Sequence, residues 1–289
     1  MLNTYVPFPR YENAVFFGDR ATETLAALRI FGRALIGGDI PSMETLHPAE
    51  KMLECTQCAL RNRPKILDAA VRRMHADYVL LEANGRIGLD PSVLAAPLAE
   101  AGISVKVLDV RGPTVDVIRR AGALYGEERQ AERVVRDYEA RLHAVLASPS
   151  LPPLRILPLL GIRHPIEDQV HVFAATPKAL LTAEIIERLG CRNALEGVEC
   201  AREAIEGLVP IDRRGLAALA AEARPDVAAL CGDASAAGAL LAASCAMSAK
   251  GPRSVPALAL PWHGPALEVR LPRTLEIWKR TLGTAFGTR

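Results

Sequence analysis

Aromatic side chains and excess charge are both scarce in this chain, and each shortage excludes a class of partner. Phe, Trp and Tyr make up only 4% of the 289 residues. The 35 Lys and Arg residues nearly balance the 33 Asp and Glu residues, which leaves a net charge of +2. Nucleic-acid binding depends on a basic surface and, for single strands, on aromatic rings that stack on bases. We therefore expect no nucleic-acid partner, and the low aromatic content also disfavours ligand clamps built from several stacked rings.

Long apolar runs are also missing. No stretch approaches the roughly 20 apolar residues that a membrane-spanning helix requires. Residues 1–10 (MLNTYVPFPR) do not show the basic region followed by an apolar region that marks a secretory signal peptide. We therefore expect a cytoplasmic protein for the chain as written, and a periplasmic protein if a leader has been removed.

Familiar catalytic motifs do not occur in the sequence. It contains no nucleophile elbow, no Walker phosphate loop, no HExxH zinc motif and no G-x-G-x-x-G dinucleotide loop. Its serine, histidine and aspartate residues suggest no catalytic triad. We therefore expect a protein that binds a ligand and is not an enzyme.

Two of the six cysteines, Cys55 and Cys58 (ECTQC), have a spacing that is typical of metal and redox sites. Two thiolates can hold one soft metal ion, but a closed zinc site needs two further ligands, and His47 is the nearest candidate. A redox pair like that of thioredoxin begins a helix directly after a strand, and no strand is predicted there. A metal site, a ligand contact and an inert surface pair remain open as alternatives.

Short apolar runs alternate with helical patterns along most of the chain. Strands are predicted at residues 14–17, 78–81, 105–108, 156–160 and 227–230. Helices of about 10–15 residues separate most of them, which favours βαβ units and parallel sheets.

One segment differs from this alternation. Between residues 127 and 147, apolar side chains recur at steps of three and four, which predicts a single long amphipathic helix. Pro149, Pro152 and Pro153 follow it directly. A long helix that ends in a proline-rich hinge is the best domain boundary in the chain. We therefore expect an N-terminal lobe at residues 1–120, a connecting long helix at 121–150 and a C-terminal lobe at 151–289.

Six short motifs, in this order around the long helix, carry a resemblance to a known family. They are ATETLAALRIFGRALIGGD (21–39), PKILDAAVRRMHADYVLLEANG (64–85), AEAGISVKVLDV (99–110), TAEIIERLGCRNAL (182–195), LAALAAEARPDVAALCGD (216–233) and LPRTLE (271–276). In this order the chain resembles the helical-backbone substrate-binding proteins of ABC importers, also called class III. The resemblance covers nearly the whole chain.

The resemblance implies a fold and a function. The fold is an α/β structure of two Rossmann-like lobes with parallel sheets, joined by one long rigid helix. The function is to hold a metal chelate (a corrinoid, haem or siderophore) or a metal ion in a cleft between the lobes. The implied partners are that small-molecule ligand and, if the protein is exported, an ABC permease. The alternative is a cytosolic metal-handling or metallocofactor-assembly protein that uses Cys55 and Cys58.

Candidate binding residues follow from a rule for parallel sheets, in which ligands bind beyond the carboxyl ends of the strands. Each loop taken alone could equally be an ordinary strand-to-helix turn, whereas the whole set favours the lining of a cleft. The candidates for ligand binding are Phe17, Asp19, Arg20, Glu82, Asn84, Arg163, His164, Asp233, Trp262 and His263, and the candidates for metal binding are Cys55 and Cys58.

Overall fold

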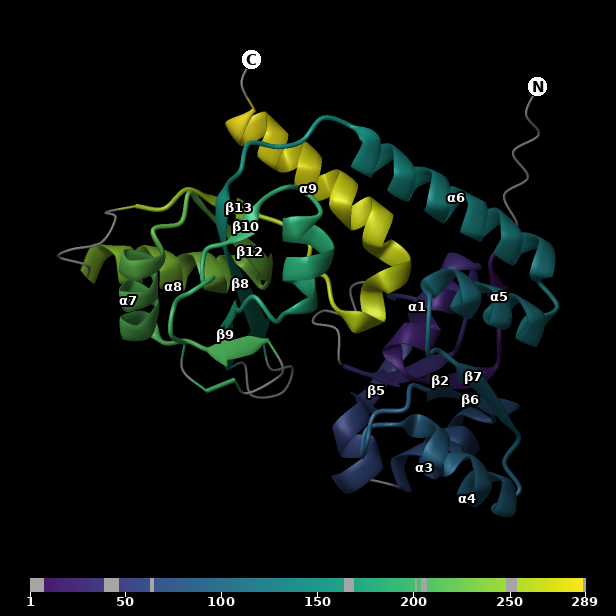
Figure 1. The fold of residues 1–289 in the computed structure, drawn as a ribbon. Coiled ribbons are helices and arrows are strands. Elements are labelled where there is room, and N and C mark those ends of the chain that lie inside the picture. Colours follow the sequence, from purple (N-terminus) through teal and green to yellow (C-terminus); the bar gives the residue numbers. More distant parts are fainter. Residues whose placement is uncertain are drawn as a thin grey trace. The chain divides into compact units, whose positions relative to one another are not determined.

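The alternating strands and helices form two units, each built on its own β-sheet (Figure 1). The computed structural model describes residues 8–38, 47–62, 65–163, 169–200, 202–203, 207–247 and 254–287. The first unit comprises Met1–Glu139 together with Ala266–Val269, and the second comprises Ala140–Pro265 together with Arg270–Arg289. The α/β class expected from the sequence is confirmed in both units.

The sheet of the first unit has five parallel strands in the order β5-β4-β2-β6-β7. Its strands are β2 (Ala14–Phe17), β4 (Ala34–Gly37), β5 (Lys51–Cys55), β6 (Tyr78–Ala83) and β7 (Val105–Asp109). Its helices are α1 (Asp19–Ala27), α3 (Lys65–Met74), α4 (Ala95–Glu100) and α5 (Thr114–Tyr125). Two short strands, β1 (Arg10–Tyr11) and β3 (Ile30–Phe31), pair separately. The strands predicted at 14–17, 78–81 and 105–108 are confirmed, whereas β5 was not predicted.

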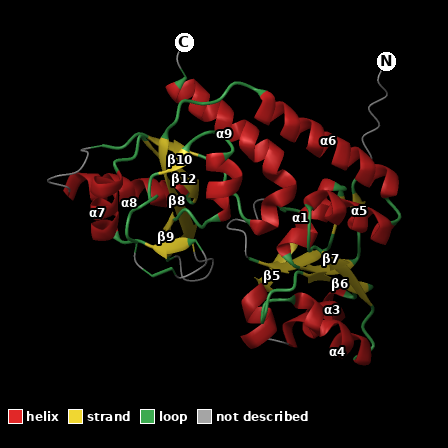
Figure 2. Cartoon of the chain, in the orientation of Figure 1, coloured by secondary structure: helices red, strands yellow, loops and turns green. Residues whose placement is uncertain are grey.

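The central strand β2 divides the core of this unit in two, because successive side chains of a strand point to opposite faces of a sheet. Ala14 and Phe16 belong to a buried cluster that includes residues of α1, α5 and α6 (Glu128–Ala147). Val15 and Phe17 belong to a second cluster that includes residues of α3 and α4. Figure 2 shows helices covering both faces of this sheet. All four residues of β2 are fully buried, which explains its unbroken apolar sequence.

The second unit has a sheet in the order β11-β9-β8-β12-β13, and β10 also pairs with β8. Its strands are β8 (Arg155–Arg163), β9 (Val170–Ala175), β10 (Arg192–Asn193), β11 (Leu208–Pro210), β12 (Val227–Gly232) and β13 (Ala257–Ala259). Its helices are α7 (Arg213–Ala223), α8 (Ala234–Met247) and α9 (Leu271–Phe286). Asp212 caps α7 by accepting a hydrogen bond of 2.7 Å from the Gly215 amide.

One strand of the second sheet departs from the parallel arrangement that the sequence predicts. β9 runs antiparallel to β8, with Arg163 opposite Val170, and β11 runs antiparallel to β9. A parallel connection needs a crossover of a dozen or more residues, whereas only six residues separate Arg163 from Val170. A separation this short therefore rules out a parallel pairing of β8 and β9.

The long helix predicted at residues 127–147 is confirmed as α6, a single unbroken helix at Glu128–Ala147. The division between the two units falls within it, after Glu139. Among the described residues, no helix has both the length and the apolar character needed to cross a membrane.

A buried group of charged residues lies in the first unit. His47 places its Nε2 atom 2.7 Å from the carboxylate of Glu23 in α1, and its Nδ1 atom 3.1 Å from Glu50. The other oxygen of Glu50 accepts a hydrogen bond of 2.6 Å from the Gly32 amide. None of the three side chains is more than 1% exposed. Burial alone would lower the pKa of His47, but the hydrogen bond with Glu23 and the negative charges of Glu23 and Glu50 outweigh it and raise the pKa to about 9.

We predict that His47→Gln lowers the free energy of unfolding at pH 6.5 by about 3–5 kcal/mol, because two buried carboxylates then lose their cation. The pKa of His47 is higher in the folded than in the unfolded protein. Its stabilising effect is therefore complete below pH 6.5 and is lost as the pH rises through about 9. Urea unfolding at several pH values measures both effects. Adding Glu23→Gln to the variant should restore part of the lost free energy of unfolding. If His47→Gln lowers that free energy only slightly, and equally at pH 6.5 and pH 9.5, then His47 is not the cation that stabilises the two carboxylates.

Candidate functional site

All five strands of the first sheet are parallel, so their carboxyl ends meet at one edge. We call the residues at this edge the first edge: 18–20 after β2, 37–38 at the end of β4, 54–58 around the end of β5, and 82–85 at the end of β6. The topology thus brings together segments up to about 60 residues apart, as the rule for parallel sheets predicts.

Two buried carboxylates hold the loops of the first edge in place. Glu82 accepts a hydrogen bond of 2.9 Å from the Ala21 amide in the first turn of α1, and another of 3.0 Å from the side chain of Asn84. Both carboxylate oxygens of Asp19 lie 3.1 Å from the Gly38 amide nitrogen, which donates to them. Glu82 is 6% exposed and Asp19 is 3% exposed. These two carboxylates and Asn84 therefore hold the loops of the first edge in place through hydrogen bonds.

Gly18 is required where β2 passes into α1. Its φ angle is +126°, a conformation that side-chain-bearing residues rarely adopt. A Cβ atom at this position would lie 2.2 Å from the Cβ of Glu82. The absence of a side chain at Gly18 therefore allows Glu82 to reach the start of α1.

Two further candidates of the first edge have structural contacts of their own. Phe17 is 0% exposed and its side chain packs in the core, and its expected contact with a ligand stays a prediction. Arg20 donates to the carboxylate of Glu268 at 2.6 Å and to the Gly112 carbonyl at 3.0 Å. Glu268 also accepts a hydrogen bond of 2.8 Å from the Thr114 hydroxyl. Arg20 thus fastens the segment Ala266–Val269 to the first unit.

In the second unit, the parallel strands β8, β12 and β13 end at a common edge. We call residues 161–163, 231–233 and 261–263 the second edge. The Asp233 amide donates to the Gly161 carbonyl at 2.8 Å, and the Asp233 carboxylate accepts 2.9 Å from the Ala236 amide in the first turn of α8. A Cβ atom on Gly161 would lie 2.3 Å from the Asp233 carbonyl oxygen, so these two loops touch through their backbones.

His263 and Trp262 follow β13. His263 is 0% exposed, and neither of its ring nitrogens has a hydrogen-bond partner in the part of the chain that the structure describes. Burial, together with the positive charge of Arg188, lowers the pKa of His263 to about 4. The imidazole is therefore neutral at pH 7. Trp262 is half-buried.

The remaining ligand candidates lie at the carboxyl end of β8. The backbone of Arg163 is the last residue of that strand. The Arg163 side chain and His164 lie outside the described residues, so their expected contacts stay a prediction.

The cysteine pair lies at the first edge. Cys55 is the last residue of β5, and Cys58 begins a short π-helical turn at Cys58–Asn62. The expectation that no strand precedes the pair is therefore wrong. The half-exposed residues of β5 lack the apolar run by which a buried strand is recognised. His47, the expected extra ligand, is committed to Glu23 and Glu50.

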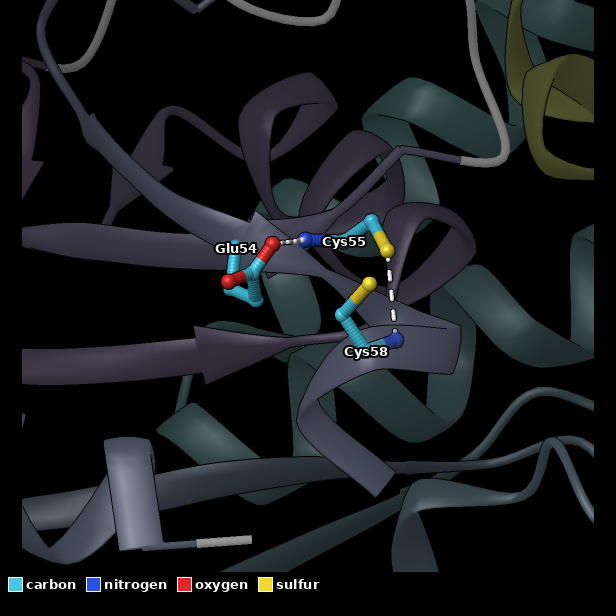
Figure 3. A group of neighbouring side chains, drawn as sticks. All are labelled: Glu54, Cys55 and Cys58. Carbon is cyan, nitrogen blue, oxygen red and sulfur yellow. Dashed lines mark hydrogen bonds between the residues drawn. The ribbon is translucent and has the colours of Figure 1, made fainter. Parts of the chain in front are cut away.

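A third ligand atom lies beside the two sulfur atoms. One ligand atom each from Glu54, Cys55 and Cys58 lie within 4.8 Å of one another. The Cys58 amide donates a hydrogen bond of 3.2 Å to the Cys55 sulfur, and the Cys55 amide donates one of 3.1 Å to the Glu54 carboxylate. Figure 3 shows the two sulfur atoms turned toward each other, with Glu54 beside them at the end of β5. Burial raises the pKa of Cys55, and the neighbouring Cys58 and Glu54 add to the rise.

A hollow of about 530 Å³ lies at the opposite end of the second sheet. It is lined by residues at the amino ends of β8 and β10 and beside them, namely Pro153, Arg155, Arg192, Asn193 and Glu196. None of the residues predicted to bind ligand belongs to it.

Comparison with known proteins supplies the fold family. No family model and no curated protein sequence matches the chain. Among solved structures, the periplasmic haem-binding protein BhuT in complex with two haems matches 96% of this chain and 99% of its own, with a TM-score of 0.60 and 20% identity. RhuT, a periplasmic haem-binding protein from Roseiflexus sp. RS-1, matches 96% of this chain and 98% of its own (TM-score 0.61, 18% identity). A periplasmic haem-binding protein from Pseudomonas aeruginosa matches 96% and 92% (TM-score 0.56, 19% identity).

The chain has the fold of these periplasmic haem-binding proteins. The match extends over nearly the full length of both chains, so it includes both sheets and the long helix α6. This confirms the fold that the six sequence motifs imply.

Within this substrate-binding-protein fold, sequence reasoning missed two carboxylates. Glu54 directly precedes Cys55, and a strand predicted to end at Cys55 would have placed it beside the pair. Glu268 meets Arg20 from 248 residues away, and no local pattern signals that contact.

We predict that Gly18→Ala destabilises the protein far more than Gly126→Ala does. Gly126 also has a positive φ angle, +68°, but a Cβ atom there meets nothing within 4 Å. Gly126→Ala should therefore lower the free energy of unfolding only through backbone strain, by about 1–2 kcal/mol. Gly18→Ala adds a clash with Glu82 and should cost at least about 3 kcal/mol. Urea unfolding of both variants measures the difference, and equal losses would show that Glu82 is not fixed against Gly18.

A second prediction concerns pH. His263 has a lower pKa in the folded than in the unfolded protein, so the unfolded state gains a proton first as the pH falls. Stability should therefore decrease between pH 6.5 and about 4, by a few kcal/mol. His263→Gln and His263→Phe should both remove this part of the pH dependence, whatever their effect on packing. If the free energy of unfolding falls with pH as steeply in both variants as in the original chain, the pH dependence does not come from His263.

Proposed function

We propose that this chain is the substrate-binding protein of an ABC importer and that its ligand is a metal chelate, with haem as the first candidate. One observation carries the proposal: the fold matches periplasmic haem-binding proteins over 96% of the chain and nearly all of theirs. A further match, covering 93% of this chain with a TM-score of 0.51, is a substrate-binding protein of an ABC transporter from Listeria monocytogenes. An importer needs a permease, which we propose as the protein partner.

The two edges support a binding role. In open parallel sheets ligands bind beyond the carboxyl ends of strands, and the hydrogen bonds of Glu82, Asp19 and Asp233 fix the loops there. Loops that are already ordered lose little conformational entropy when a ligand binds. The same sequence offers no catalytic motif, which supports binding without a chemical step.

The first turns of α1 and α8 already have carboxylate acceptors. Glu82 accepts from the Ala21 amide of α1 and Asp233 from the Ala236 amide of α8, so each helix start already has a carboxylate beside it. We propose that recognition falls to side chains in and next to the edges, above all to Arg163, His164 and Trp262. Histidine is a common iron ligand and arginine pairs well with carboxylates, and haem carries both iron and carboxylates.

A titration tests this function. We predict that adding haem to the purified protein produces a saturable shift of the haem absorption band, and that cobalamin and a ferric hydroxamate produce weaker responses or none. His164→Ala should weaken haem binding at least about tenfold, which corresponds to about 1.4 kcal/mol. His143→Gln, in α6, is the matched control and should bind haem like the original chain.

The outcomes of this titration test the proposed function and the role of His164 separately. If neither haem, cobalamin nor the hydroxamate binds with saturation, the proposed function is wrong. If haem binds and His164→Ala leaves its affinity and spectrum unchanged, the function stands and the assignment of His164 is wrong.

A further inference from the structure

The group Glu54, Cys55 and Cys58 offers ligands for a metal ion that the proposed haem-binding function does not use. It provides two sulfur atoms and one carboxylate oxygen, all within 4.8 Å of one another. All three side chains are half-buried, so solvent reaches them while the backbone holds them. They come from the end of β5 and the turn that follows it, which fixes their spacing.

The chemical nature of the three ligand groups indicates which metal ion they bind. Thiolates favour soft or borderline ions such as Zn²⁺, and zinc accepts carboxylate oxygen beside sulfur. Iron–sulfur clusters take four cysteine ligands in their common forms, which this group does not supply. Three protein ligands leave one position of a tetrahedral zinc ion open for water. We propose that Glu54, Cys55 and Cys58 bind one Zn²⁺ ion, with water or an exogenous ligand in the fourth position.

Small movements of the three side chains bring their ligand atoms to the distances of a tetrahedral zinc site. Ligand atoms around a tetrahedral zinc ion lie roughly 3.3–3.8 Å apart, given bonds of about 2.0–2.3 Å. The atoms of this group need to approach by about 1.5 Å at most, which rotations of half-buried side chains supply. The hydrogen bond from the Cys58 amide to the Cys55 sulfur stays compatible with binding, because it stabilises negative charge on that sulfur.

Charge distinguishes this site from a thioredoxin-like redox pair. A nucleophilic redox cysteine has a lowered pKa, which favours its thiolate. Here the carboxylate of Glu54 lies within 4.8 Å of both sulfur atoms, and a negative charge beside a thiol disfavours its thiolate. A divalent cation removes this repulsion. Binding then releases one proton from each thiol, with no change in oxidation state, and zinc affinity increases with pH.

The test uses the full chain, reduced with a phosphine and freed of metal with a chelator. We expect one Zn²⁺ per chain in competition with a chromophoric chelator. Co²⁺ as a spectroscopic probe should give an intense near-ultraviolet sulfur-to-cobalt band. Cys58→Ser should weaken Zn²⁺ binding by more than about 100-fold, since loss of a direct ligand exceeds the usual effect of a supporting residue. Glu54→Gln should weaken it less while keeping the sulfur-to-cobalt band.

Cys200→Ser is the matched control, because Cys200 is also half-buried but has no cysteine three residues away. It should bind Zn²⁺ like the original chain. Circular dichroism checks that each variant is folded, and the cobalt spectrum of the original chain needs no variant at all. Absence of the sulfur-to-cobalt band in that chain would overturn the proposal, as would unchanged Zn²⁺ affinity in Cys58→Ser. Haem binding is measured separately, so failure of either proposal leaves the other standing.

Discussion

Buried carboxylates that accept backbone hydrogen bonds determine the shape of the first edge. Strands of a parallel sheet end together, and the loops that leave them carry amide groups with no partner inside the sheet. Glu82 accepts from α1 and Asp19 accepts from the residue after β4. A hydrogen bond to a charged group contributes about 1.5–3 kcal/mol, which offsets part of the cost of burying the carboxylate. The glycine at position 18 follows from this arrangement, because any side chain there would displace Glu82.

In the second edge, the loops that leave the strands are held in a different way. Its loops touch through their backbones at Gly161 and Asp233, and the Asp233 carboxylate serves the first turn of α8. In both units the polar groups nearest the strand ends thus satisfy the protein's own amides. Glu82, Asp19 and Asp233, which the sequence offers as ligand contacts, therefore hold the loops of the edges in place.

The overall architecture could be predicted because it depends on local patterns. The apolar run of β2, the periodicity of α6 and the Asp212 cap are all visible in short windows of sequence. β5 was missed because its residues are only half-buried, so no apolar run marks it. Residues 170–173 are recognisable as a strand, but the antiparallel direction of β9 was missed, because strand direction depends on the length of the connection, which the apolar pattern does not report.

The candidate site was less predictable, because contacts between distant residues decide what each side chain can do. The rule for strand ends selected the right segments, but it could not show that Phe17 faces the core. Nor could it show that Arg20 pairs with Glu268 from the far end of the chain. His47 looked like a spare metal ligand until its two buried carboxylate partners were known. The low aromatic content remains compatible with haem, since aliphatic side chains also pack against its ring.

The central claim is that the ligand binds at the carboxyl ends of the strands. Hydrogen–deuterium exchange of backbone amides, measured by mass spectrometry with and without haem, tests it most directly. The account predicts slower exchange with haem at residues 84–86, 231–233 and 261–263. Slowing confined to residues 153–155 and 192–196, around the hollow at the amino ends of the second sheet, would contradict the account.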